Sequence, residues 1–238
     1  MKHVFPSQRL HEDLRKLIAS SETGQKLPSE PELARKLGVA RATLREALRV
    51  FETQGMLYRR QGSGTYVMKP AHVLDSGLEV LESIETMAVR NGLSVKVGDW
   101  KVENRTPTEE ETAALGLEAG KSVVSISRVV LADNLPVAYL IDVLPEDVLS
   151  ADDLSAGFTG SVLDLLLKRG APQLAFSRTE INAIAATGEV GRLVGLQRGA
   201  VLLRFVAQLY TTTNRVIDYS FSYFLPGYFR FHVVRRIG

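Results

Sequence analysis

The chain has 238 residues, of which 45% are hydrophobic and 24% charged, the composition of an ordinary globular protein with enough apolar material for a core. It contains no cysteine, which excludes disulfides, thiolate metal sites and cysteine nucleophiles. The first residues show no apolar run typical of a signal peptide, and no apolar stretch is long enough to span a membrane. We therefore expect a cytoplasmic protein with no membrane partner.

Positive charge is concentrated near the N-terminus. Residues 1–70 carry 13 lysines and arginines against 7 acidic residues, whereas the remainder carries 16 against 20. A basic head on an acidic body suggests a polyanionic partner for the head alone. Such an imbalance also lies within ordinary variation, so charge leaves both interpretations open.

Three amphipathic helices are predicted in the basic head. Leucine and isoleucine recur at helical spacing over residues 7–20. Ser29 followed by Glu32 is a capping box that predicts a second helix, which Gly38 ends. A third helix is expected from about residue 41 to residue 54.

The third predicted helix has two different faces. Its apolar stripe consists of Leu44, Ala47, Leu48 and Phe51. Arg41, Arg45 and Arg49 recur every four residues and share another face. Arginine on such a helix can pair with guanine O6 and N7 in the major groove of DNA. Because Glu46 and Glu52 lie on the same helix, a solvated, ion-paired face is the alternative for any single arginine.

A hairpin is predicted after the third helix. Short strands at 56–60 and 65–68 flank a glycine-rich turn, and three helices plus a hairpin form a winged helix-turn-helix, assigned to 1–69. Glycine lets the turn approach a groove, and Ser29 could bind a phosphate at a helix N-terminus. The candidate DNA contacts are Ser29, Arg41, Thr43, Arg45, Arg49, Gln61, Gly62 and Gly64.

The rest of the chain is expected to form an α+β domain with an antiparallel sheet over 95–238, after a weakly helical linker over 70–94. Residues 117–123 resemble 196–202, an offset of 79 residues, and each segment begins a long strand, a polar turn and a second strand. This internal repeat predicts two hairpins in one sheet, formed by a duplicated subdomain.

The segments 27–34, 38–48 and 55–67 resemble the GntR family of bacterial regulators, and the likeness covers about residues 10–68. It implies that Arg41, Thr43 and Arg45 contact DNA and that Gly62 enters the minor groove.

Two departures from the family pattern stand in the head. Pro31 replaces an arginine that often reads guanine in the family, and Ala40 replaces the serine or threonine before the third helix. Alanine is a poor N-cap, at a cost of about 1 kcal/mol. We therefore expect an altered operator and weaker binding.

The C-terminal part resembles the HutC subgroup of that family over roughly residues 75–238. The similar motifs lie at 115–120, 127–129, 135–137, 160–162 and 217–220. The effector domain of this subgroup is called UTRA and is similar in fold to chorismate lyase. The resemblance implies a homodimeric repressor whose binding to a pseudo-palindromic DNA operator is modulated by a small-molecule effector.

The effector-binding candidates are Arg128, Asp142, Ser161, Asp218 and Tyr223. By the resemblance, Arg128 clamps an anion, Ser161 adds donors at a helix start, and Asp218 fixes hydroxyl groups. The alternative is that Arg128 pairs with a neighbouring carboxylate, Ser161 merely caps a helix and Asp218 is exposed.

The pocket is expected to be more apolar than that of sugar-phosphate sensors. Val130 stands where such sensors often carry a second arginine, and 140–143 and 225–227 lack the usual polar pattern. Aromatic residues follow at 221, 223 and 224, although aromatics in a strand are more often core than ligand contacts. A phosphosugar effector is therefore not favoured.

Other functional classes have weaker support in the sequence. The four histidines are scattered, and no glycine-rich phosphate loop follows a strand, so we expect no catalytic residue, no metal and no cofactor. A lyase-like enzyme, a C-terminal domain that only dimerises, and a nucleoid protein without sequence preference are the alternatives.

Overall fold

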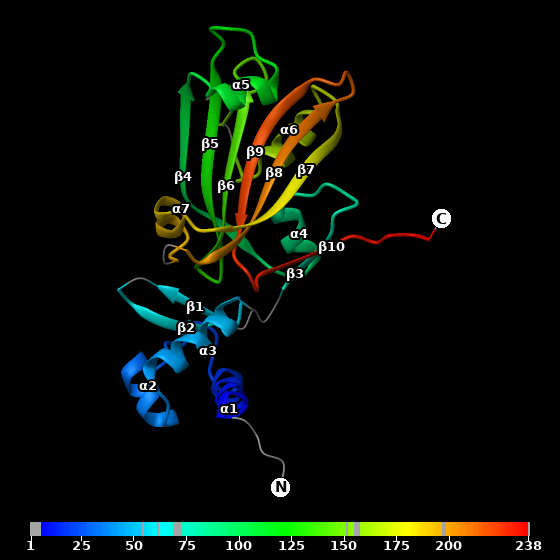
Figure 1. Cartoon of the computed structure of the whole chain (residues 1–238). Coiled ribbons are helices and arrows are strands. Elements are labelled where there is room, and N and C mark those ends of the chain that lie inside the picture. The colour runs from blue at the N-terminus through cyan, green and yellow to red at the C-terminus, as the bar shows by residue number, and fades with distance from the viewer. Residues whose placement is uncertain are drawn as a thin grey trace. The chain divides into compact units, whose positions relative to one another are not determined.

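The computed structural model describes residues 6–53, 55–60, 62–68, 73–150, 152–154, 158–196 and 199–237. The chain forms two compact units (Figure 1). The first comprises the chain up to Val73 with Ala185–Val201 and Pro226–Tyr228. The second comprises Leu74–Ile184, Leu202–Leu225 and Phe229–Gly238.

The first unit contains the predicted winged helix-turn-helix. Its elements are α1 (Pro6–Ser20), α2 (Glu30–Leu37), α3 (Arg41–Thr53), β1 (Leu57–Arg60) and β2 (Gly64–Val67). The helices and the hairpin enclose one apolar core, which includes Leu14, Leu44, Phe51 and Val67. The apolar periodicity that predicted the helices therefore marks the buried faces.

The second unit is built on a six-stranded sheet, whose order is β4-β5-β6-β9-β8-β7. Its strands are β4 (Val95–Arg105), β5 (Val123–Ala132), β6 (Leu135–Pro145), β7 (Leu174–Ala185), β8 (Val201–Thr211) and β9 (Val216–Phe224). The pairings β4–β5, β5–β6, β6–β9 and β8–β9 are all antiparallel. This confirms the expected α+β fold with an antiparallel sheet.

The internal repeat predicted from the sequence is visible in the topology. The order β4, α5 (Glu109–Leu115), β5, β6 recurs as β7, α7 (Gly188–Leu193), β8, β9. Both predicted hairpins form, and Asp133 and Asn134 have positive φ at the first turn, as Asn214 has at the second. Because β6 and β9 pair, the two halves meet at the centre of the sheet.

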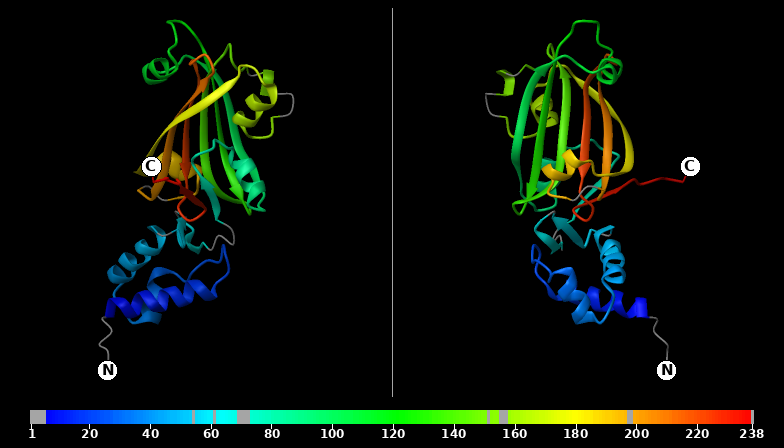
Figure 2. Two further views of the ribbon diagram at one scale, coloured as in Figure 1. Left: turned by 90° about the vertical axis from the view of Figure 1, so that its right-hand side faces the viewer. Right: turned by 60° about the vertical axis from the view of Figure 1, so that its left-hand side comes forward.

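The two faces of the sheet are covered by different elements (Figure 2). On one face, α6 (Val162–Arg169) and the 3-10 turn η1 (Asp152–Leu154) pack against Val124, Ile126 and Leu144. On the other face, α5 packs against β9, and its Leu115 lies in a second apolar cluster. The strands β5 and β6 are buried on both faces for this reason.

The range expected as a linker includes folded elements of the second unit. These are β3 (Leu74–Gly77), which pairs in parallel with β10 (Phe229–His232), and α4 (Ile84–Arg90). Within the described part of the linker expected over 70–94, the helix is confined to Ile84–Arg90. None of the helices in the described ranges is long and apolar enough to cross a membrane.

Candidate functional site

Two groups of candidate residues lie in the two units, and the first is on α3. The apolar stripe of this helix is buried, whereas Arg41, Thr43, Arg45 and Arg49 are exposed, as the spacing predicts. Three guanidinium groups therefore lie on the solvent side of one helix. This is the arrangement that a DNA-reading helix requires.

Arg45 belongs to a network of ion pairs centred on Glu30, the first residue of α2. Its Nη2 lies 2.8 Å from Glu30 Oε2, and Arg59 Nη2 lies 3.0 Å from Glu30 Oε1 and 3.1 Å from Glu52 Oε1. The hydrogen bond from Arg45 is the main cause that lowers the pKa of Glu30, whereas burial raises the pKa of Glu52. The sequence did not identify Glu30 as part of this face.

The remaining DNA candidates on the helices are also engaged locally. Arg49 Nη1 lies 2.9 Å from Glu46 Oε1, and both side chains are exposed, so the pair contributes little to stability. The backbone N–H and the hydroxyl of Ser29 both donate to Glu32 Oε2, at 3.0 and 2.7 Å. Arg45 and Arg49 are therefore ion-paired within the protein, as the alternative interpretation of this helix face predicted. DNA phosphates would have to compete with these carboxylates.

The turn of the β1–β2 hairpin is shaped by glycine, and Gly62 is exposed. Gly62 has φ +72°, with open space around the position a side chain would take, and Gly64 has φ +129°. Tyr58 and Tyr66 stack across the strands, with ring centroids 5.2 Å apart. Gln61, the third candidate in this turn, lies outside the described residues.

The second group is a set of buried charges at the centre of the sheet. Arg128 on β5 forms an ion pair with Asp142 on β6, and both are buried. Asp218 on β9 is 6% exposed. Burial first, and then the neighbouring charge of Asp142, raise the pKa of Asp218 well above its ordinary value. Three of the predicted effector residues are thus brought together, with Arg128 already paired and Asp218 buried rather than exposed.

A fourth ionisable residue of this group was not predicted. Glu85 lies on α4, in the range expected as a linker, and interacts with the charges of Arg128 and Asp142. Burial is the main cause that raises the pKa of Glu85. A capping serine at position 83 followed by a helical apolar pattern was the available signal. We refer to Arg128, Asp142, Asp218 and Glu85 as the buried charge cluster.

Ser161 lies beside this cluster at the start of α6. A side chain built on the preceding Gly160 would lie 3.2 Å from Glu85 Oε1, which places the α6 N-terminus next to Glu85. Ser161 is 2% exposed, and its hydroxyl accepts from the N–H of Asp164 at 3.0 Å. It therefore caps α6, as both interpretations of this residue require.

The N-termini of α4 and α6 are joined by a hydrogen bond. The hydroxyl of Ser83, the N-cap of α4, donates to Asp164 Oδ2 at 2.7 Å and accepts from the N–H of Thr86 at 3.0 Å. One serine therefore fixes α4, which carries Glu85, against α6, which carries Ser161.

The structure does not bring Tyr223 to the buried charge cluster. It pairs with Tyr139 across β6 and β9, whereas Asp142 pairs with Ser220. Side chains alternate along a strand, so Tyr223 and Asp218 point to opposite faces of β9. The rings of Tyr139 and Tyr223 stack with centroids 6.1 Å apart.

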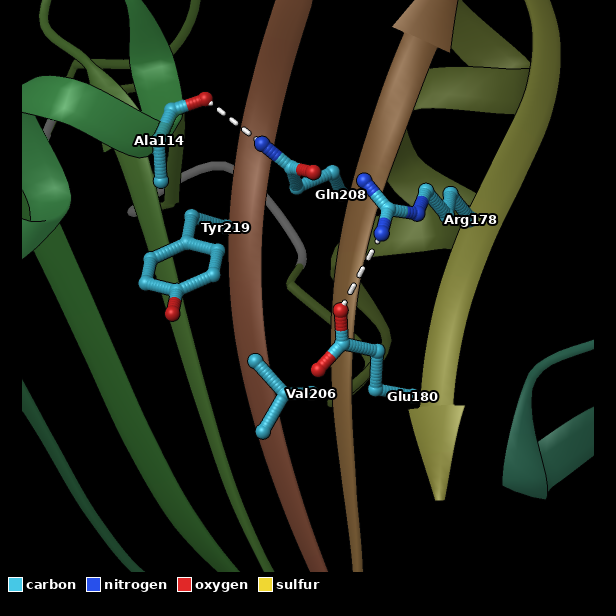
Figure 3. A pocket seen from close by; sticks show the side chains of 6 residues that line it. All are labelled: Ala114, Arg178, Glu180, Val206, Gln208 and Tyr219. Carbon is cyan, nitrogen blue, oxygen red and sulfur yellow. Dashed lines mark hydrogen bonds and ion pairs between the residues drawn. The ribbon is translucent and has the colours of Figure 1, made fainter.

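A hollow of about 200 Å³ lies on that opposite face (Figure 3). Its lining residues are Ala114, Arg178, Glu180, Val206, Gln208 and Tyr219. Gln208 Nε2 donates to the carbonyl of Ala114 at 2.8 Å, and Arg178 pairs with Glu180 at 3.2 Å. Its polar groups are therefore largely used within the protein.

Two family models match the chain, one over the head and one over the C-terminal part. The model of the family "Bacterial regulatory proteins, gntR family" matches residues 6–67, and that of the "UTRA domain" matches residues 90–230. The chain belongs to the GntR family. This GntR-family chain is a transcription regulator with a DNA-binding head and a HutC-like UTRA effector domain, which confirms the family predicted from the sequence.

Relatives of this GntR-family chain carry names of the same kind. The HTH-type transcriptional repressor NagR of Bacillus subtilis is 28% identical over 214 residues, 89% of this chain and 86% of the relative. The histidine utilization repressor of Pseudomonas putida is 29% identical over 179 residues, 73% and 68% of the two chains. The crystal structure of PhnF from Mycobacterium smegmatis matches with TM-score 0.62 at 23% identity over 96% of this chain and 100% of that one, which supports the fold.

Proposed function

We propose that this chain is a cytoplasmic, homodimeric repressor that binds a pseudo-palindromic duplex operator through α3 and the β1–β2 turn. The observation that carries the proposal is the exposed row of Arg41, Thr43 and Arg45 on α3, in a head that also presents a glycine turn. Relatives named as repressors support the direction of regulation. A dimer would place one α3 in each half-site.

We further propose that a small molecule binds the UTRA domain at the buried charge cluster, beside Ser161, and changes operator affinity. The support is that the cluster joins α4, which follows the head along the chain, to the central strands β5, β6 and β9. Such a ligand would shift the population of dimers whose heads match the half-site spacing. Buried charge is costly, and ionisable groups with shifted pKa values cluster at functional sites, which favours a ligand site here over a domain that only dimerises.

The first test is selection of binding sites from a random-sequence duplex pool by the full-length chain at fixed salt. We expect an enriched palindrome. Arg45→Ala should then lose roughly 1–3 kcal/mol of discrimination at one position in each half-site, because bidentate base contacts have that size. Uniform, steeply salt-dependent binding without a motif would contradict sequence-specific regulation.

A matched control for Arg45→Ala is Arg178→Ala. Both arginines are exposed and paired with a glutamate, but Arg178 lies on β7 in the second unit. The control should leave the selected motif unchanged. Loss of the motif in both variants would mean that the effect of Arg45→Ala is not specific to α3.

A further inference from the structure

The strand β7 is an open edge of the six-stranded sheet (Figure 1). It lies beside β8, and no other strand of the described residues pairs with its outer side. No residue of β7 is buried, and most are exposed. Two large apolar side chains are among them, since Phe176 is 52% exposed and Ile181 46%. A long exposed edge of this kind is a template for pairing with another strand.

The opposite edge of the sheet is protected against such pairing. The strand β4 carries Lys96 and Lys101, and its register with β5 is irregular. Lysine and a bulge on an edge strand are common devices that prevent the addition of a further strand. In contrast, the 12 residues of β7 include neither lysine nor proline, and their charged members are Arg178 and Glu180. The two edges therefore differ in how readily they accept a partner.

The charges of β7 are complementary to those of a second β7 that runs in the opposite direction. Arg178 and Glu180 lie two positions apart on one face of the strand and form an exposed ion pair 3.2 Å long. If two copies pair around Thr179, Arg178 of each copy lies opposite Glu180 of the other. Opposite charges across two strands stabilise their pairing. A register displaced by two residues in either direction would instead oppose two arginines or two glutamates.

The same register also matches the apolar ends of the strand. Leu174 of one copy lies opposite Ile184 of the other. Ala175 lies opposite Ala183 in the same way. In an interface with two-fold symmetry every such pair occurs twice, so one surface must be complementary to itself. The sequence of β7 meets this requirement at its centre and at both ends.

We propose that two copies of this chain associate through antiparallel pairing of β7 with β7, about a two-fold axis at Thr179. The pairing joins the two sheets into one continuous sheet. This rests on the proposed function, because it locates the contact of the homodimer proposed there. A second copy is the partner that the charges of β7 fit, since Arg178 and Glu180 determine one register with their own counterparts.

The alternative arrangement of a dimer packs one sheet face on the other. The face that carries the hollow at Val206 and Tyr219 would then be covered, together with Arg178 and Glu180. The two arrangements differ at Thr179. Its side chain projects from the opposite face of β7, because side chains alternate along a strand. Only edge pairing therefore brings Thr179 of two copies together.

The chain contains no cysteine, so a single introduced thiol reports on one position alone. In full-length Thr179→Cys, paired strands would hold the two Cα atoms about 4.5–5.5 Å apart, a distance that a disulfide spans. In Ser177→Cys the two thiols would be four residues apart along the strands, or about 13 Å, which is too far. Mild oxidation should therefore produce disulfide-linked dimers of Thr179→Cys and none of Ser177→Cys on non-reducing gels.

Thr179→Lys provides a second, non-covalent measurement. It places two like charges opposite each other at the axis, so the dimer dissociation constant from sedimentation should rise about fivefold or more. Added salt should reduce this effect. Thr106→Lys, the same change at an exposed position after β4, should leave the constant unchanged. Arg178→Ala should also keep the dimer, because it removes an exposed ion pair without opposing like charges.

The outcomes for the β7 pairing and for the proposed function can be told apart. If the wild-type chain sediments as a dimer while the two cysteine variants cross-link equally or not at all, the β7 pairing is overturned and the homodimer stands. A monomeric wild-type chain without cross-linking would reject both. Cross-linked Thr179→Cys without any operator motif would support the pairing and reject the regulator.

Discussion

Glu30 determines how the arginines of the head are held. It accepts hydrogen bonds from Arg45 on α3 and forms an ion pair with Arg59 on β1. One carboxylate therefore orients a candidate base-reading residue and lies against a residue that precedes the wing turn. The charge available for DNA on this face is therefore lower than the number of arginines suggests.

Replacing Glu30 by glutamine should weaken sequence discrimination. The variant removes a negative charge from the DNA-facing side and frees Arg45, so affinity for random duplex should rise while affinity for the operator rises less or falls. Fluorescence anisotropy with both duplexes at several salt concentrations measures the ratio. Glu46→Gln, a neighbouring exposed acid paired with Arg49, is the control for charge alone. An unchanged ratio in Glu30→Gln would show that Glu30 does not orient Arg45.

The buried acids should make stability depend on pH in a defined direction. The pKa values of Asp218 and Glu85 are raised in the folded chain, so the folded state binds more protons than the unfolded state above about pH 4. Stability from this source is present at acid pH and is lost as pH rises through the folded pKa. Asp218→Asn should therefore be more stable than wild type at neutral pH, and the difference should shrink towards pH 4. Chemical denaturation of both chains across this range measures it, and a difference that does not vary with pH would contradict the shift.

At the level of elements, helix caps stabilise individual helices, and one of them also joins two helices. Ser83 caps α4 and also donates to Asp164 on α6, whereas Thr108 caps α5 on the other face of the sheet and forms its capping box with Glu111. The two caps are alike in local chemistry. They differ because Ser83 also joins α4, which follows the head along the chain, to α6.

Ser83→Ala and Thr108→Ala should therefore have similar costs in stability and different effects on regulation. Each should lose about 1 kcal/mol of unfolding free energy, the usual value of an N-cap. Only Ser83→Ala should change the affinity of the full-length chain for its operator, because it loosens α4 from α6. Denaturation curves and operator titrations on both variants provide the measurement. Equal operator affinities in the two variants would show that the attachment of α4 to α6 does not affect DNA binding.

The elements that the sequence predicted are those defined by local signals. Capping residues, helical periodicity and the turn residues at 133–134 act within a few positions of the chain, so the helices of the head and the two hairpins could be predicted. The strand β3 could not, because its partner β10 lies about 155 residues further along the chain. Glu85 was missed for the same reason, since its place in the cluster depends on strands far away in sequence. Tyr223 was grouped with Asp218 by proximity in sequence, and strand alternation separates the two.

At the level of the whole molecule, dimerisation should dominate DNA affinity. A single helix and wing contact few bases, and joining two heads makes the second binding event intramolecular. A duplex with both half-sites should bind two chains and do so roughly 100-fold more tightly or better than a duplex with one. Titration with mass measurement of the complexes tests both numbers. Equal affinity for the two duplexes would mean that each head binds independently.

The repeated topology of the sheet also determines where its buried charges gather. Arg128 and Asp142 come from the first half of the repeat and Asp218 from the second, and they meet where β6 pairs with β9. Neither half holds these three residues alone, so the cluster exists only where the two halves pair. A substitution at this seam therefore alters the cluster while the outer strands β4 and β7 keep their sequence.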